Sequence, residues 1–297
     1  MRMIIVGASG TIGSALRAAA MPLGKEVVGT CHSRTHEGLL RYDMREKRLG
    51  SVVGEIGPKD TVYLLSSYTD VSWIYANQEK ARKLNVRATQ RLIDEIAPSG
   101  ARIIFMSSAE VFDGEGGGYN EKSLPKPLSA YGRMKFEIEE YLSKKKCNSC
   151  IVRTGWNVSW EYDHPCVVKM TYKALLSPGA KMAQDNVFSI TDVRDTAQGL
   201  LKLGQRSDVS VCNLASSPAI ARNELASMIM DLSKHKGSMS YETALFADIR
   251  YPEKRPRRTN LDNAFAALSL GMDFKPPGML IRQKVELLDK LKLCPDI

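Results

Sequence analysis

The sequence predicts an α/β protein: a Rossmann-type, doubly wound parallel sheet followed by a smaller C-terminal α/β domain. Two observations carry this prediction. Short β-rich runs alternate with helical stretches through the first half of the chain, which is typical of right-handed crossovers and of a parallel sheet covered on both faces. A glycine-rich turn, GASGTIG, stands between the first β-rich run and the first helical stretch, where such folds place their tight first turn.

The elements of the first half are assigned in order from periodicity and from helix-ending residues. The first helix is expected over Thr11–Ala20, where apolar residues recur at helical spacing. A longer helix is expected over Ile74–Ile96, because Pro98 and Gly100 follow it. The other expected elements are strands at Met3–Gly7, Glu26–Cys31, Thr61–Leu65, Arg102–Met106 and Ser149–Arg153, and a helix from an N-cap at Ser129 to about Leu142.

Beyond Gly155 the alternation loosens, which indicates a change of domain. Helices are expected over Asp192–Leu203, Arg222–Ser233 and the stretch LDNAFAAL, and a short strand over Val209–Asn213. A proline-rich basic segment, YPEKRPRRTN, precedes the last of these helices. We therefore predict a first domain over residues 1–155, to which residues 187–205 return, and a smaller domain made mainly of residues 156–297.

Composition narrows the class of partner. The 297 residues carry a net charge of +9, which favours anionic ligands. The charge is dispersed and no recognition motif accompanies it, so a phosphorylated small molecule is favoured over nucleic acid. No apolar run reaches the ~18 residues of a membrane helix, and the apolar start is too short for a signal peptide, so we expect a cytoplasmic protein. Cys147 and Cys150 form a lone CxxC without a second pair, which indicates reduced thiols and no metal site.

The glycine turn predicts a dinucleotide site. Glycines let the backbone turn tightly and approach a ligand closely, and the helix that follows points free N–H groups at a phosphate. The spacing is Gly-x-x-Gly-x-x-Gly, and glycines also serve ordinary strand-to-helix turns, but the position after a first strand favours dinucleotide binding. The expected ligands are Gly7, Ser9, Gly10, Thr11, Ile12 and Gly13.

The residues at the end of the second strand help to distinguish an NAD site from an NADP site. An acidic residue there would hold the ribose 2′-hydroxyl of NAD, whereas arginine suits the 2′-phosphate of NADP. No acid occupies residues 30–34, and the nearest is Glu37. Ser33 and Arg34 are placed to contact a phosphate, although a solvated loop arginine is the alternative. NADP is therefore the expected cofactor, with NAD as the second choice.

Tyr131 and Lys135 are four residues apart in YGRMK and share a face of the expected helix. A lysine cation favours a nearby phenolate and lowers the tyrosine pKa from its usual value near 10. Such a pair can pass a proton to or from a carbonyl oxygen. An exposed amphipathic pair has the same spacing, so the pair alone is a weak signal.

A third signal stands between these two. The stretch FMSSAEVFDG ends an apolar strand in Ser107 and Ser108, before the helix that carries Tyr131 and Lys135. The glycine turn, the serine pair and the Tyr-x-x-x-Lys pair, in this order, resemble the extended short-chain dehydrogenase/reductase superfamily over nearly the whole chain. FMSSAEVFDG, YGRMKFEIEEYL and the tail RPRRTNLDNAFAAL resemble its dTDP-4-dehydrorhamnose reductase branch.

The resemblance implies an oxidoreductase that passes a hydride from NADP(H) to the C4 carbonyl of a nucleotide-linked 4-keto-6-deoxy sugar. It implies that Tyr131 supplies the proton, that Ser108 bonds the carbonyl, and that Lys135 holds the nicotinamide ribose and tunes Tyr131. It also implies a substrate contact from Asn157, while Arg258 is expected to grip the substrate pyrophosphate. Further cofactor contacts are implied at Asp43, Met44, Leu65, Ser66, Ser67 and Asn85, and at Tyr131 beside Lys135.

Two departures from this branch leave alternatives open. Ala109 and Glu110 stand where the branch usually has Asp-Tyr. A glutamate at the position of Glu110 is similar to the pattern of the sugar-nucleotide 4,6-dehydratases. Those enzymes also need an acidic residue at the preceding position, where this chain has Ala109. Glu110 is therefore a candidate base for epimerisation, and His164 lies loosely where epimerase-reductases keep a histidine. The alternatives are an epimerase or epimerase-reductase, and a non-catalytic NADP-binding subunit resembling that of methionine adenosyltransferase. A homodimer is the expected assembly.

Overall fold

A computed structural model describes residues 2–32, 36–161 and 164–291 of the chain. Its central sheet has the strand order β11-β6-β5-β4-β1-β2-β3, and every pairing in it is parallel. The order reverses between β1 and β4, where a doubly wound sheet opens a crevice at the carboxyl ends of its strands. The Rossmann-type fold is thus confirmed. The strands are β1 Arg2–Val6, β2 Glu26–Cys31, β3 Leu39–Arg41, β4 Thr61–Leu64, β5 Arg102–Met106, β6 Ser149–Thr154 and β11 Val211–Leu214.

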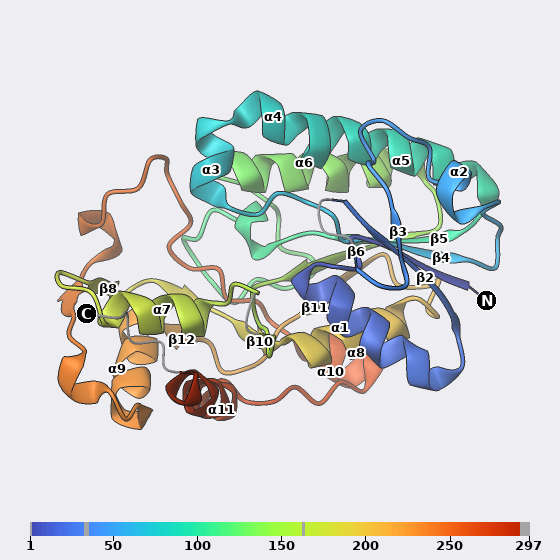
Figure 1. The fold of residues 1–297 in the computed structure, drawn as a ribbon. Coiled ribbons are helices and arrows are strands. Elements are labelled where there is room, and N and C mark those ends of the chain that lie inside the picture. Colours follow the sequence, from blue (N-terminus) through green and yellow to red (C-terminus); the bar gives the residue numbers. More distant parts are fainter. Residues whose placement is uncertain (1, 33–35, 162–163, 292–297) are drawn as a thin grey trace.

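Helices cover both faces of this sheet (Figure 1). One face packs against α1 (Thr11–Ala20), α8 (Val193–Leu203) and α10 (Ala264–Leu270). The other packs against the helices between Val71 and Ile96 and against α6 (Ala130–Lys145). Adjacent β1 residues point to opposite faces, so Ile4 and Ile5 are both fully buried but belong to different cores. Two-sided burial explains why these strands read as continuous apolar runs.

The long helix expected over residues 74–96 is broken into shorter pieces. It begins at Val71, because the Asp70 side chain accepts a hydrogen bond from Trp73 N at 2.9 Å and caps it. Asn77 leaves the helical conformation and donates from its side chain to Trp73 O. The pieces are α3 (Val71–Ala76), α4 (Gln78–Arg82), a π-helical turn (Lys83–Ala88) and α5 (Thr89–Ile96). π-Helical turns are rare and are frequently found at functional sites.

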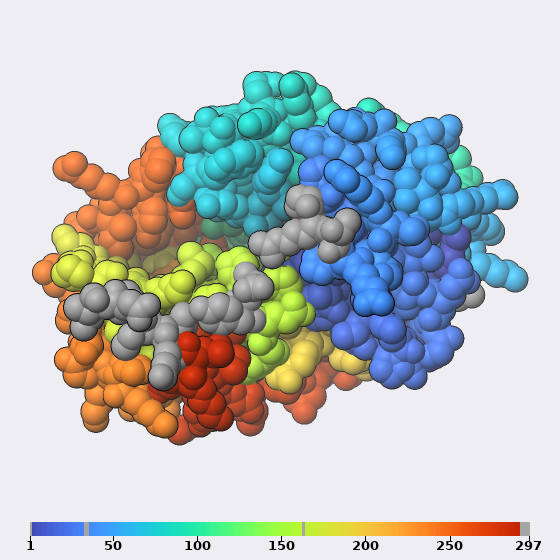
Figure 2. Space-filling view, viewed as in Figure 1, coloured from blue at the N-terminus to red at the C-terminus, as the bar shows by residue number. Residues whose placement is uncertain are grey.

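The second half adds a third core beside the sheet. This core gathers apolar residues of α7 (Val167–Leu175), α9 (Arg222–Leu232) and α11 (Pro277–Lys290). Three two-stranded pairings surround it: β7 with β10, β9 with β12 and β8 with β13. The strands are β7 Trp156–Val158, β8 Lys181–Ala183, β9 Val187–Phe188, β10 Ile190–Asp192, β12 Ile220–Ala221 and β13 Glu242–Ala244. In Figure 2 these later segments occupy the opposite side of the molecule from the N-terminal segments in blue.

The segment expected to return to the first domain divides between two places. Its helix, α8, packs against α1, whereas β9 and β10 pair with β12 and β7 outside the central sheet. The strand expected over residues 209–213 forms as β11 and extends the sheet beside β6. The domain boundaries themselves stay a prediction. Short elements complete the fold: α2 Gly50–Val53 and the 3₁₀ turns η1 Met21–Leu23, η3 Ala97–Ser99, η4 Ala109–Val111, η5 Lys236–Ser238 and η6 Phe246–Asp248.

Within the described ranges, no helix is both long enough and apolar enough to cross a bilayer. Every cysteine described there is a free thiol, including Cys147 and Cys150 of the CxxC, and the same residues contain no cluster that could hold a metal ion.

Candidate active site and cofactor cavity

Ser108, Tyr131 and Lys135 come together where β5 ends. Ser108 leaves β5 and caps η4, accepting a hydrogen bond from Glu110 N at 3.2 Å. Helix α6 packs against η4 and carries Tyr131 and Lys135, which are both buried. The Ser108 side chain lies close enough to the Tyr131 hydroxyl to lower its pKa. Lys135 Nζ lies 5.7 Å from the centre of the Tyr131 ring. The structure thus brings together the three residues that the motifs singled out.

Burial dominates the electrostatics of this group. Burial raises the pKa of Tyr131, the nearby Glu110 carboxylate raises it further, and the Ser108 side chain opposes the rise. The sequence argument expected a lowered tyrosine pKa, and that expectation is wrong for the protein alone. The phenol therefore keeps its proton at neutral pH and is suited to act as an acid. Burial also lowers the pKa of Lys135, to about 8, against the charge of Glu139.

Glu110 is tied to the N-terminus of α6. Ser129 Oγ donates to Glu110 Oε2 at 2.8 Å, and the same hydroxyl accepts a hydrogen bond from Gly132 N at 3.0 Å. Burial raises the pKa of the Glu110 carboxyl, while the Ser129 bond and the charge of Arg255 lower it. Ser129 is the N-cap that the sequence predicted, but its second role as an anchor for Glu110 had no sequence signal.

The glycine turn meets the loop after β4. Gly7 has φ +94°, and a Cβ there would lie 2.9 Å from Ser66 N, so only glycine fits without strain. Gly10 N donates to Gly7 O, and α1 begins at Thr11, the next residue. A Cβ on Gly13 would approach Gly7 O to 2.2 Å, which shows how closely α1 seats on the turn. The predicted residues Leu65 and Ser66 therefore lie directly beside the turn.

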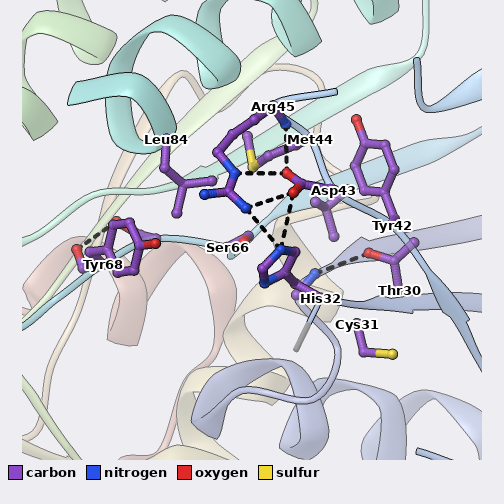
Figure 3. Close-up of a pocket in the computed structure, with 13 residues that line it drawn as sticks. Thr30, Cys31, His32, Tyr42, Asp43, Met44, Arg45, Ser66, Tyr68 and Leu84 are labelled. Carbon is purple, nitrogen blue, oxygen red and sulfur yellow. Dashed lines mark hydrogen bonds and ion pairs between the residues drawn. The ribbon is translucent and has the colours of Figure 1, made fainter. Parts of the chain in front are cut away.

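A cavity of about 160 Å³ opens at this crevice (Figure 3). Five of its lining residues were predicted from the sequence to contact the cofactor: Gly7, Asp43, Met44, Ser66 and Ser67. Its remaining lining residues are Val6, Thr30, Cys31, His32, Tyr42, Arg45, Tyr68 and Leu84. Since the cavity lies at the carboxyl ends of β1, β2 and β4, beside the glycine turn, it fits the adenosine end of a dinucleotide. Ser33 and Arg34, also assigned to the cofactor, lie outside the described residues.

His32 and Arg45 lie together beside Asp43 on the wall of this cavity (Figure 3). Arg45 donates to Asp43 through Nε at 2.9 Å and Nη2 at 2.6 Å, and the same Nη2 lies 3.0 Å from His32 Nε2. These bonds hold the pKa of the Asp43 carboxyl well below its usual range, so Asp43 stays ionised. Sequence reasoning missed both His32 and Arg45; their signal was that each stands within two residues of a position already assigned to the cofactor.

Asn85 supports the cavity from the π-helical turn. Its Oδ1 accepts hydrogen bonds from Ser67 Oγ at 3.1 Å and Tyr68 N at 2.9 Å, and its Nδ2 donates to Tyr68 O at 3.0 Å. The amide therefore fixes the loop after β4 against the cavity. Its direct contact with a cofactor stays a prediction.

The predicted substrate residues lie on the second half of the chain. Asn157, on β7, accepts a hydrogen bond from Thr196 Oγ1 at 2.6 Å, so its carbonyl oxygen already has a partner. Arg258 donates its backbone N–H to Gly114 O, and its buried Nε has no partner among the described residues. His164 lies within 3.3 Å of Glu161 on its own loop, and none of its described contacts reaches Tyr131.

A segment that we call the strap, residues 251–260, reaches back from the second half to the N-terminus of α6. Glu253 Oε2 accepts the backbone N–H of Ala130 at 2.7 Å, beside Tyr131. Arg255 Nη2 donates to Ser72 Oγ at 2.8 Å, near the start of α3. The strap therefore joins the two halves next to Tyr131. The sequence indicated its proline-rich, basic character and a phosphate contact from Arg258, but not its bonds to Ala130 and Ser72.

Three curated proteins are similar to this chain in sequence. A dTDP-4-dehydrorhamnose reductase of Mycobacterium tuberculosis is 28% identical over 207 residues, 68% of this chain, and the match spans 65% of that relative, slightly less than two thirds. A probable low-salt glycan biosynthesis reductase, Agl14, of Haloferax volcanii is 26% identical over 88% of this chain and 90% of its own. Methionine adenosyltransferase 2 subunit beta of Bos taurus is 27% identical over 51% of this chain and 46% of its own.

Solved structures and a family model agree with the fold. The crystal structure of a hypothetical dTDP-4-dehydrorhamnose reductase from Sulfolobus tokodaii has a TM-score of 0.76 and 25% identity, covering 92% of this chain and 96% of its own. A dTDP-4-dehydrorhamnose reductase from Bacillus anthracis, in complex with NADP, has a TM-score of 0.75 and 18% identity, covering 97% of this chain and 99% of its own. The model of the RmlD substrate binding domain matches residues 1–277, so the chain belongs to the RmlD substrate binding domain family, in line with its reductase-like motifs.

Proposed function

We propose that this protein is a reductase of a nucleotide-linked 4-keto-6-deoxy sugar, similar to dTDP-4-dehydrorhamnose, and that it uses NADPH. One observation carries the proposal: a buried tyrosine that keeps its proton stands at the carboxyl ends of the strands, with the Ser108 side chain and the Lys135 ammonium close to it. The reductase names of the relatives support the substrate class.

The reaction needs one hydride and one proton to turn the C4 carbonyl into a secondary alcohol. NADPH, when bound, supplies the hydride. Tyr131 gives its hydroxyl proton to the carbonyl oxygen, and Ser108 donates a hydrogen bond to the same oxygen. Tyr131 is then a phenolate, which the Lys135 cation stabilises. Asn157 and Arg258 are proposed to bind the nucleotide part of the substrate, and Glu110 stays the candidate for an added epimerase step.

The proposal is tested with a panel of dTDP- and UDP-linked 4-keto-6-deoxy sugars. Loss of NADPH absorbance, with a 4-hydroxy product identified by NMR, is the expected result. Cofactor that stays bound through purification, together with epimerised sugar and no net NADPH consumption, would instead assign the chain to epimerases. Co-purification with a methionine adenosyltransferase and no turnover of any sugar would assign it to the non-catalytic subunits.

The preference for NADP is proposed to rest on Arg45 and His32 as well as on the predicted Ser33 and Arg34. Arg45 commits Nε and Nη2 to Asp43, which leaves its Nη1 outside that fork (Figure 3). An arginine fork suits a phosphate, and the pair stands on the cavity wall beside the end of β2. The complex of a structural relative with NADP supports the same cofactor.

Replacing Arg45 with methionine should weaken NADP binding by about 10- to 100-fold and leave NAD binding nearly unchanged, because a charge-assisted hydrogen bond contributes about 1.5–3 kcal/mol. Titration calorimetry with each dinucleotide measures the two affinities. Arg48→Met is the matched control, since Arg48 lies in the same segment with 83% of its side chain exposed. Equal losses for both dinucleotides would remove Arg45 from cofactor discrimination.

A cytoplasmic location and a homodimer are also proposed. The free thiols among the described cysteines support a reducing compartment.

A further inference from the structure

We infer that Glu139, held in place by Arg153 and Ser107, is a positioning residue that keeps Lys135 charged and directed at Tyr131. This inference deepens the proposed function and rests on it. Glu139 stands one helical turn after Lys135 on α6 and is 3% exposed. None of the three residues belongs to the predicted catalytic set.

Hydrogen bonds to Glu139 connect the three side chains into one buried network. Arg153, at the end of β6, donates to Glu139 Oε1 through Nε at 3.1 Å and to Oε2 through Nη2 at 2.7 Å. Ser107 Oγ donates to Glu139 Oε1. All three side chains are buried. The carboxylate is therefore fixed from two neighbouring strands, β5 and β6, while it remains part of the helix that carries Lys135.

The two serines at the end of β5 interact with different residues of α6. Successive residues of an extended chain point to opposite sides. Ser107 donates a hydrogen bond to Glu139, whereas the Ser108 side chain acts on the Tyr131 hydroxyl. The carbonyl of Met106, the residue before the pair, accepts a hydrogen bond from Lys135 Nζ at 2.8 Å. The strand end thus contacts the tyrosine, the lysine and the glutamate of α6, and it sets where each of them stands.

The charge of Glu139 has a direct effect on Lys135. The charged group that acts on the ammonium is Glu139, which is paired with Arg153. Tyr131 lies on the same helix as Lys135, and Glu110 on η4 acts on that tyrosine. Burial disfavours the charged lysine, and the Glu139 carboxylate opposes this effect. The aromatic ring of Phe105, 5.0 Å from Nζ, adds a weaker attraction. Without the carboxylate, burial would act on the lysine unopposed.

Stability alone gives a poor account of this network. Apolar side chains of similar volume often stabilise a core as well as a buried ion pair does. Arg153 Nη1, moreover, is buried without a partner among the described residues, so the pair is not fully satisfied. A carboxylate placed four residues from the active lysine is better explained by its effect on that lysine.

The test measures the Lys135 pKa without any substrate. Protein labelled with ¹³C at lysine Cε is titrated by NMR, and the Lys135 signal is assigned by its loss in Lys135→Met. The wild-type midpoint is expected at about 8. Glu139→Gln alone leaves Arg153 as an unpaired buried cation and is expected to fold poorly. The double variant Glu139→Gln/Arg153→Met removes both charges without leaving a buried unpaired ion, and its Lys135 midpoint is expected to fall below that of the wild type.

Activity provides the second readout. In the double variant, the alkaline limb of the pH profile of kcat/KM should move to lower pH by the same amount as the Lys135 midpoint. The single variant Glu139→Asp keeps the negative charge, so its pH profile should stay close to that of the wild type. Asp195→Asn is the matched control, because it breaks a comparable pair with Lys275, 2.7 Å apart, on the other face of the sheet. An unchanged Lys135 midpoint in the double variant overturns the inference. A wild-type protein that reduces no keto-sugar overturns the proposed function instead, and the NMR titration still decides the role of Glu139.

Discussion

Replacing Tyr131 with phenylalanine should lower kcat by about 100- to 10,000-fold, the range of a lost general acid. The substitution removes one hydroxyl, close to the Ser108 side chain, from a buried ring. The ring still fills its site, so the fold and the cofactor cavity should persist. NADPH affinity is therefore expected to stay within about twofold to threefold of the wild type, since Tyr131 does not line that cavity. Steady-state kinetics and calorimetric titration of NADPH measure the two effects.

Tyr141→Phe is the matched control for this substitution. Tyr141 is on the same helix, and its hydroxyl donates at 2.6 Å to Asp94 at the surface. Loss of that hydroxyl should leave kcat unchanged and cost at most about 1 kcal/mol of stability. A Tyr131→Phe variant that keeps full activity would show that another group supplies the proton. Glu110, whose pKa burial raises, would then be the first residue to replace.

Local signals in the sequence were enough to predict six of the seven strands of the central sheet and the helices α1, α6, α8, α9 and α10, whereas β3, α7 and α11 were not predicted. Strands buried on both faces are continuous apolar runs, and helices begin after cap residues such as Ser129 and Asp192. The glycine turn, Ser108 and the Tyr131–Lys135 pair were found for the same reason. Each is a short motif whose geometry is set within a few residues of the chain, or by the fixed order of strands and helices.

Features set by contacts between distant segments could not be predicted. The break at Asn77 and the π-helical turn place Asn85 against the loop after β4, and no periodicity indicates that register. The Glu139–Arg153 pair joins a helix to a strand whose pairing is known only from the fold. Glu253 of the strap bonds Ala130 across 123 positions of sequence. The direction of the Tyr131 pKa shift likewise depends on burial, which the spacing of two residues does not give.

Gly132→Ala should lower kcat/KM by about 100-fold and destabilise the protein by about 1–3 kcal/mol, although alanine is normally the better helix former by about 1 kcal/mol. A Cβ on Gly132 would lie 2.1 Å from Glu110 O, which is backbone and cannot rotate away. Relief of this clash requires α6 to move from η4. Since Tyr131 is the neighbouring residue on α6 and Ser108 caps η4, the movement separates the acid from its hydroxyl partner.

Gly278→Ala separates this clash from the general effect of the substitution. Gly278 lies in the first turn of α11, and a Cβ there would meet only Met228 Cε, at 3.6 Å, an ordinary van der Waals distance. That variant should have unchanged kcat/KM and equal or slightly greater stability in urea denaturation. If Gly132→Ala matches Gly278→Ala in both measurements, α6 can move relative to η4 without cost. In that case the close contact between them does not set the position of Tyr131.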